Sequence, residues 1–170
     1  DRVYKLTFRT NFENGKFIGQ TAFGTEELAD DRAEVTFHNW CGRKSEDNEI
    51  YILNNGTYGG SGGDGEISMT LLRTPMYSAH PIEERQLAPH DRFLDHIDMG
   101  ERELEYRITA EKTVDKEAEV FNMPPYSVPF FPSGDGIKRN TAVEIDNGNI
   151  LLTTMQRQND GILIRLFNTQ

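Results

Sequence analysis

Cysteine is nearly absent from this sequence, since Cys41 is the only one in 170 residues. A lone cysteine cannot close an internal disulfide, which excludes a disulfide scaffold and favours a reducing compartment. No apolar run is long enough to cross a bilayer, and no basic-then-apolar signal pattern opens the chain. These features predict a cytoplasmic protein that lies outside the membrane.

Basic residues are also scarce: 18 Lys and Arg stand against 28 Asp and Glu, a formal net charge of −10. A negative field repels phosphate backbones and anionic lipid surfaces. We therefore expect neither nucleic acid nor a membrane as a partner. A neutral substrate or another protein fits this charge better.

What the sequence does contain is alternation of apolar and polar residues, the pattern of half-buried strands. It runs through residues 3–9, 66–73, 101–110 and 162–167. Residues 49–53 are apolar enough to form a strand buried on both faces. Because the chain both opens and closes in such a segment, we expect it to be a fragment of a longer protein.

Turn residues separate these segments, and they predict how the strands are connected. Asn147-Gly148 lies between Val143–Ile145 and the apolar residues 150–152, which predicts a tight hairpin there. Residues 25–32 are the only helical candidate. Many short strands with little helix predict an all-β fold, an antiparallel β-sandwich spanning residues 1–170 as a single segment. The residues expected to point inward are Tyr4, Leu6, Phe8, Ile50, Ile52, Ile67, Met69, Leu71, Leu104, Tyr106, Ile108, Val143, Ile145, Ile164 and Leu166.

Two long stretches, residues 74–99 and 122–140, lack this alternation and are expected to be loops. Prolines keep the second of them out of a central strand. Both stretches are rich in large apolar residues, which are rarely left in water without a partner. We expect residues 74–99 and 123–132 to be interface surfaces, through Met76, Phe93, Leu94, Phe130 and Phe131.

The first loop also gathers groups that could bind a metal. It holds three histidines and three aspartates: His80, His90, His96, Asp91, Asp95 and Asp98. Such side chains can build a catalytic zinc site, but their spacing matches no compact ligand motif. Polar loop residues are the favoured interpretation, and an independent hydrolase using this loop is the less favoured alternative.

Other candidates for chemistry are weaker. His38 precedes Cys41 by three residues, but a catalytic thiol also needs an oxyanion hole and an activating base. Trp40 beside them is interpreted as a core residue rather than a sugar platform. The glycines of residues 59–63 lack the Lys-Ser/Thr and the helix of a phosphate-binding loop, and they are interpreted as a flexible hairpin loop.

Several short sequence motifs occur in a fixed order along most of the chain. They are residues 11–17 (Asn-Phe-Glu-Asn-Gly-Lys-Phe), 38–42 (His-Asn-Trp-Cys-Gly), 53–60 (Leu-Asn-Asn-Gly-Thr-Tyr-Gly-Gly), 65–67 (Gly-Glu-Ile), 71–75 (Leu-Leu-Arg-Thr-Pro), 77–81, 98–106 and 150–167. In this order they resemble the C-terminal β region of glycoside hydrolase family 38 α-mannosidases, in particular the bacterial branch. The resemblance implies a supersandwich related to mutarotase-like domains.

The same resemblance implies where chemistry takes place. In the family, an N-terminal domain carries the zinc, the nucleophile and the acid/base of a retaining mannosidase, and none of its motifs occurs here. No catalytic or metal-binding residue is therefore assigned. The loop after the strand ending in Arg borders the substrate pocket in relatives, so the substrate-side or interdomain candidates are Arg73, His80, Asp91, Arg92 and Asp95.

The sequence thus predicts an inactive C-terminal β-sandwich of an α-mannosidase. Its expected partners are the N-terminal catalytic domain of the same chain and a mannoside or oligosaccharide substrate, with a homo-oligomer possible. No cofactor is expected in this segment, because zinc belongs to the catalytic domain. The alternative is a free-standing, lectin-like carbohydrate-binding module, which an exposed aromatic platform would favour.

Overall fold

The computed structural model describes residues 2–12, 14–75, 96, 98–129, 131, 134–136 and 141–169. Within these residues it contains eleven strands and one helix. Their bounds are β1 Val3–Arg9, β2 Lys16–Thr21, β3 Gly24–Glu27, β4 Val35–Thr36, β5 Trp40–Lys44, β6 Glu49–Asn54, β7 Gly59–Gly63, β8 Glu66–Arg73, β9 Tyr106–Thr109, α1 Val114–Asn122, β10 Ile150–Gln158 and β11 Gly161–Asn168. No helix in this described part is long and apolar enough to cross a membrane.

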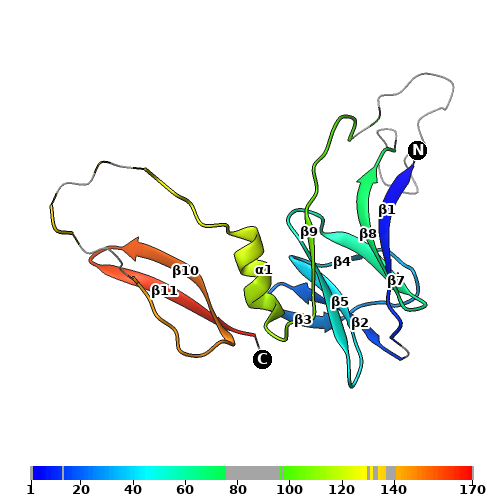
Figure 1. Ribbon diagram of the computed structural model, residues 1–170, viewed down its shortest axis with the longest axis horizontal. Helices are drawn as coiled ribbons and strands as arrows, with labels where there is room; N and C mark the ends of the chain where they lie inside the picture. The colour runs from blue at the N-terminus through cyan, green and yellow to red at the C-terminus, as the bar shows by residue number, and fades with distance from the viewer. Residues whose placement is uncertain are drawn as a thin grey trace, which may run out of the picture.

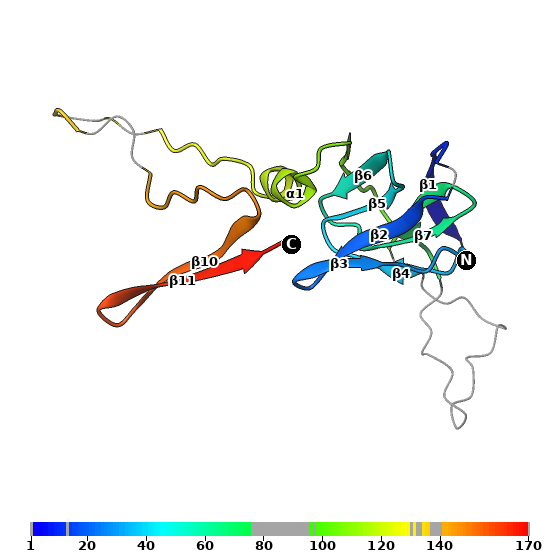
Figure 2. The ribbon, with the colours of Figure 1, turned by 90° about the horizontal axis from the view of Figure 1, so that it is seen from below.

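Two antiparallel sheets form a sandwich (Figure 1). One has four strands in the order β1-β8-β7-β4, and the other has five in the order β3-β2-β5-β6-β9. Helix α1 covers the outer face of the five-stranded sheet, so this part of the chain has three layers (Figure 2). The predicted all-β antiparallel sandwich is confirmed, with one short helix added.

The core between the sheets comes from alternate residues of their strands. Its fully buried members are Phe17, Phe37, Cys41, Ile52, Ile67 and Met69, and Phe8, Leu71 and Tyr106 pack against them. A second cluster lies under α1, where Val114 and Ala118 of the helix meet Trp40, Tyr51 and Leu53. Strand β6 contributes to both clusters, which confirms that it is buried on both faces.

The glycine-rich segment 59–63 is a buried strand, β7, and its interpretation as a flexible hairpin loop was wrong. The missing side chains let the facing sheet approach its backbone. A Cβ added at Gly62 would lie 2.5 Å from a ring atom of Phe17, and one added at Gly60 would lie 3.1 Å from Phe37. The loop itself is the two-residue turn Asp64-Gly65, whose φ angles of 50° and 77° suit these residue types.

Two predictions of local secondary structure were wrong, and a third was right only in part. Val143–Ile145 forms no strand, and β10 pairs instead with β11 around the Asn159-Asp160 turn, a much longer ladder than three residues could give. Residues 24–27 form strand β3 against β2 rather than helix. Only the last part of the predicted strand 101–110 is strand, because β9 begins at Tyr106.

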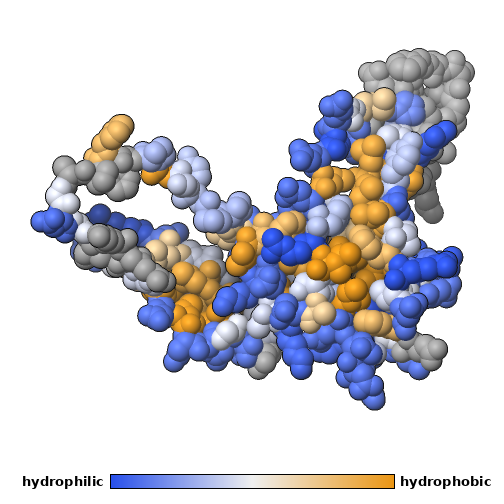
Figure 3. All heavy atoms as spheres, in the orientation of Figure 1, coloured by the Kyte–Doolittle hydropathy of each residue, from blue (hydrophilic) through white to orange (hydrophobic). Residues whose placement is uncertain are grey.

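The hairpin β10–β11 lies apart from the two sheets, on the far side of α1 (Figures 1 and 2). Phe23, in the turn between β2 and β3, meets Phe167 of β11 edge to face, with 5.7 Å between ring centroids. One face of the hairpin is apolar and exposed, as Figure 3 shows; it carries Leu152, Met155, Ile162, Ile164 and Leu166. A two-stranded hairpin with such a face is marginally stable by itself.

The hairpin explains why Ile164 and Leu166 do not point into a core as predicted. Ile108, Tyr4 and Leu6 are also more exposed than predicted, because they lie on β9 and β1, strands at the sheet edges in the described part. Val143 and Ile145 are half-buried outside any strand. The single-segment prediction for residues 1–170 stays a prediction.

Strand β1 is not paired uniformly with β8. Residues 5–9 of β1 pair in step with Glu66–Thr70, but the register shifts between Tyr4 and Lys5, so that Tyr4 lies opposite Leu72. The ladder passes over Leu71, so the extra residue of this irregularity lies on β8 and not on β1. An extra residue of this kind increases the local twist of the strand pair.

Candidate functional site

Arg73 is the predicted site residue that the structure describes; His80, Asp91, Arg92 and Asp95 lie outside the described residues. Arg73 ends β8, opposite Val3 of β1, and its side chain is exposed. His96, from the far end of the 74–99 stretch, lies close by, since its Nδ1 is 2.8 Å from the carbonyl oxygen of Thr74. The described ends of this stretch therefore meet where β8 ends.

An acidic group lies near Arg73 on the outer side of the four-stranded sheet. Glu34 pairs with Lys5 Nζ and accepts a hydrogen bond of 2.7 Å from Thr70 Oγ1. Burial raises the pKa of Glu34, but the hydrogen bonds from Lys5 and Thr70 and the charges of Lys5 and Arg73 outweigh it, so the pKa lies below its ordinary value. The positive charge of Arg73 is thus one of the charges that favour the ionised form of Glu34.

A second polar constellation, which the sequence reasoning missed, lies inside one end of the sandwich. Arg43 of β5 is only 3% exposed and points between the sheets, in line with Cys41. Its two terminal nitrogens donate to Asp30 Oδ1 at 2.7 Å and Oδ2 at 2.8 Å. One of them also donates to the carbonyl oxygen of Gly15 at 2.6 Å. This is a bidentate pair, the strongest form of charged hydrogen bonding between these groups.

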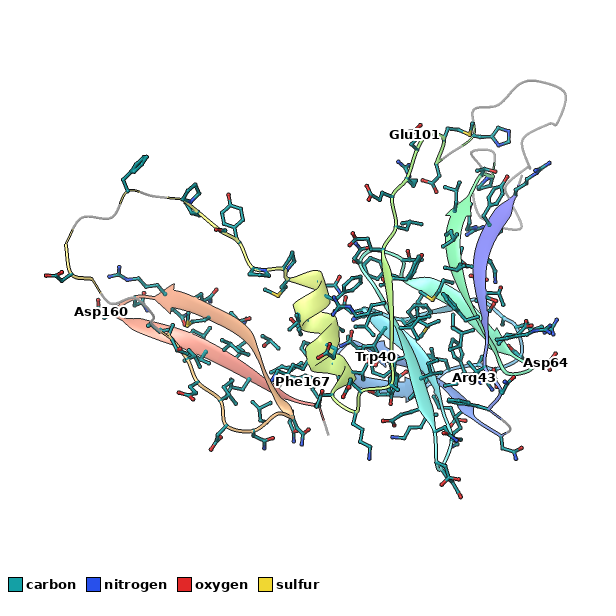
Figure 4. All side chains as sticks on the ribbon, in the orientation of Figure 1. Trp40, Arg43, Asp64, Glu101, Asp160 and Phe167 are labelled. Atoms are coloured by element: carbon teal, nitrogen blue, oxygen red, sulfur yellow. The ribbon has the colours of Figure 1, made fainter. Side chains whose placement is uncertain are left out.

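The Arg43–Asp30 pair lines a hollow of about 760 Å³, together with polar residues of the turns at that end. Arg43 and Asp64 are both found at this end of the sandwich in Figure 4. The guanidinium is occupied by Asp30 and by backbone carbonyls, so it has little capacity left for a ligand. We interpret the pair as a structural link that joins the 30–32 segment to both sheets.

The remaining sequence candidates are structural. Cys41 is fully buried, and burial raises the pKa of its thiol well above the ordinary range, so the thiolate nucleophile does not form there. Trp40 is a core residue as predicted, with its indole nitrogen 2.9 Å from Asp115 Oδ1 of α1. Within the described residues, no group of three or more His, Cys, Asp or Glu could hold a metal ion.

The described geometry therefore defines a β-sandwich domain with a polar end at Arg73. Comparison with protein families gives the same class. The family described as Glycosyl hydrolases family 38 C-terminal domain matches residues 1–84. Residues 1–84, which include β1 to β8, are thus similar to this C-terminal domain. No curated protein matches the chain.

Proposed function

We propose that the chain is a non-catalytic part of the C-terminal region of an α-mannosidase of the bacterial branch. The family match over residues 1–84 carries this proposal. It is supported by the full burial of Cys41, the single thiol of the chain, which keeps that thiol from acting as a nucleophile. The segment would contribute a wall to the sugar pocket, while retaining hydrolysis would take place in the catalytic domain.

The surfaces available for that packing support a partner within the same protein. Large exposed apolar side chains follow α1 in residues 123–129 and 131, at Met123, Tyr126, Val128 and Phe131. The exposed apolar face of the β10–β11 hairpin adds to them. Exposed apolar surface is characteristic of an interaction site. We propose that the catalytic domain covers it, with a second subunit as the other candidate.

The proposal extends to cofactor, substrate and compartment. Zinc would be held by the catalytic domain, and this segment would add no ligand to it. The substrate would be a neutral mannoside or oligosaccharide, consistent with the net charge of −10, which disfavours nucleic acid and anionic membranes as partners. The single buried cysteine is compatible with the cytoplasm.

The purified 170-residue chain is expected to hydrolyse no aryl α-mannoside, with or without added zinc. The physical reason is that catalysis needs two carboxylates placed on either side of the scissile bond, and both would belong to the catalytic domain. Release of the aryl group is followed by absorbance, with the complete enzyme as the positive control. Turnover by the chain alone that a chelator abolishes would show that this segment holds its own active site.

In the enzyme that contains this segment, the Arg73→Ala variant should lower kcat/KM at least about tenfold, because a charged hydrogen bond to a sugar hydroxyl is worth about 1.5–3 kcal/mol. Arg9→Ala is the matched control, since Arg9 is exposed on β1 at the opposite end of β8, where it pairs with Glu66 at 2.7 Å. If kcat/KM were the same for the two variants, Arg73 would not contact the substrate.

A further inference from the structure

A hollow of about 500 Å³ lies away from Arg43, where the connection between β4 and β5 meets the connection between β6 and β7. It is lined by Thr36, Phe37, His38, Asn39 and Tyr58. Three of these residues carry aromatic rings. Tyr58 is 56% exposed and His38 is also exposed, whereas Phe37 is buried in the core. The hollow thus has a mainly aromatic lining, part of which is open to solvent.

Asn54, which is fully buried at the end of β6, fixes both walls of this hollow. Its side-chain nitrogen donates to the carbonyl oxygen of His38 at 2.9 Å, and its side-chain oxygen accepts from the backbone N–H of Thr57 at 2.9 Å. Its own backbone N–H donates to the carbonyl oxygen of Asn39 at 2.9 Å. A further hydrogen bond of 3.2 Å runs from the backbone N–H of Phe37 to the carbonyl oxygen of Tyr58. The shape of the hollow is therefore set by hydrogen bonds to the backbone of its walls.

The polar groups of the lining are available to a ligand. In the part of the chain that the structure describes, the side chains of Thr36, His38, Asn39 and Tyr58 make no hydrogen bond. These groups comprise two hydroxyls, an amide and an imidazole. They can donate to and accept from neutral hydroxyl groups, while the rings offer flat apolar contact. Sites for small molecules commonly combine a largely apolar wall with a few oriented polar groups.

The charges around the hollow narrow the class of ligand that it could bind. Among the described residues, the lining contains no lysine or arginine to attract an anion and no carboxylate to hold a cation. The chain as a whole is strongly acidic, which further disfavours an anionic ligand. A neutral pyranose ring meets the remaining requirements, because it has an apolar C–H face for stacking and hydroxyl groups around its rim.

We propose that this hollow is a glycan-binding subsite of the domain, in which one neutral pyranose ring stacks on Tyr58 and hydrogen-bonds to His38 and Asn39. It would act by binding a sugar residue of the glycan, without taking part in bond cleavage. The choice of mannose as the first sugar to test rests on the proposed function. The existence of the subsite rests only on the geometry of the hollow.

Isothermal titration of the 170-residue chain with methyl α-mannoside and with a mannose oligosaccharide tests the proposal, and glucose and galactose serve as further arms. We expect saturable binding that Tyr58→Ala weakens at least about tenfold and that His38→Ala also weakens. The hydrogen bonds that fix the walls use the backbone of these two residues, so both variants should keep the fold. Circular dichroism and thermal unfolding check this. Tyr126→Ala is the matched control, because Tyr126 is an exposed tyrosine on the segment after α1.

The outcomes separate this subsite from the proposed function. Binding of any neutral pyranose that is lost in Tyr58→Ala but kept in Tyr126→Ala supports the subsite, even if the chain proves to be no part of a mannosidase. Binding that Tyr58→Ala leaves unchanged, or no binding of any of these sugars by the folded chain, overturns the subsite. In that case the activity measurements on the complete enzyme still decide the proposed function independently.

Discussion

The Asp30→Ala variant is expected to lose about 3 kcal/mol of unfolding free energy, because it leaves the guanidinium of Arg43 buried without its counter-charge. Arg43 is 3% exposed, and its Nε already lacks a hydrogen-bond partner among the described residues. The Asp30 side chain is 35% exposed, so its own desolvation is modest and the loss falls at the lower end of the range for buried pairs. Urea denaturation measures the change.

Two further variants make this prediction sharper. The double variant Arg43→Met with Asp30→Ala should be more stable than Asp30→Ala alone, because an apolar side chain then fills the end of the core. Glu27→Ala is the control: Glu27 pairs with Lys16 at 2.7 Å, but both side chains are more than half exposed, so its loss should cost about 0–1 kcal/mol. An Asp30→Ala loss no greater than that of Glu27→Ala would mean that the Arg43 pair adds nothing to stability.

The Trp40→Ala variant should lose about 3–5 kcal/mol, the usual range for truncating a buried tryptophan. Trp40 is fully buried beneath α1, and its ring meets Tyr51 edge to face with 5.2 Å between the centroids. It also donates to Asp115, which accepts a second hydrogen bond of 2.9 Å from Gln20. Removing it takes away both the apolar floor under α1 and one anchor of its first turn. We therefore expect faster amide exchange throughout α1.

Trp40→Phe separates these two contributions. It keeps an aromatic ring in place but removes the hydrogen bond to Asp115, which should cost about 1 kcal/mol for the bond plus a smaller loss of packing. Val120→Ala is the control on the same helix, because Val120 is exposed and should contribute little. If α1 exchanges no faster in Trp40→Ala than in Val120→Ala, the helix is held by contacts other than Trp40.

The sandwich could be predicted from the sequence because its main strands alternate cleanly. Val3–Arg9 and Glu66–Arg73 have the bounds expected of them, and Glu49–Asn54 is buried on both faces as its composition indicates. The Asn147-Gly148 turn misled because a favourable turn does not by itself choose the partner of the strand that follows it. Here the longer complementary ladder between β10 and β11 determined the pairing.

Helix α1 was missed although its signal is present. Val114, Ala118 and Phe121 are spaced four and three residues apart, which places them on one helical face, and all three pack over the five-stranded sheet. The Arg43 pair had a weaker signal: alternation in β5 places Arg43 on the same face as Cys41, but only the fold brings Asp30 to it. Side chains from distant segments meet at such sites, so local pattern cannot predict them.

The irregular pairing of β1 with β8 has a consequence for solubility. In the described part, β1 is an edge strand that carries exposed Val3, Tyr4 and Leu6, and an exposed apolar edge can add a strand from another molecule. The unpaired Leu71 of β8, opposite the step from Tyr4 to Lys5, increases the local twist of the pair, and a twisted edge is a poorer template for an added strand. The charged side chains of Lys5 and Arg9 oppose it further, so β1 offers a poor template for fibril growth.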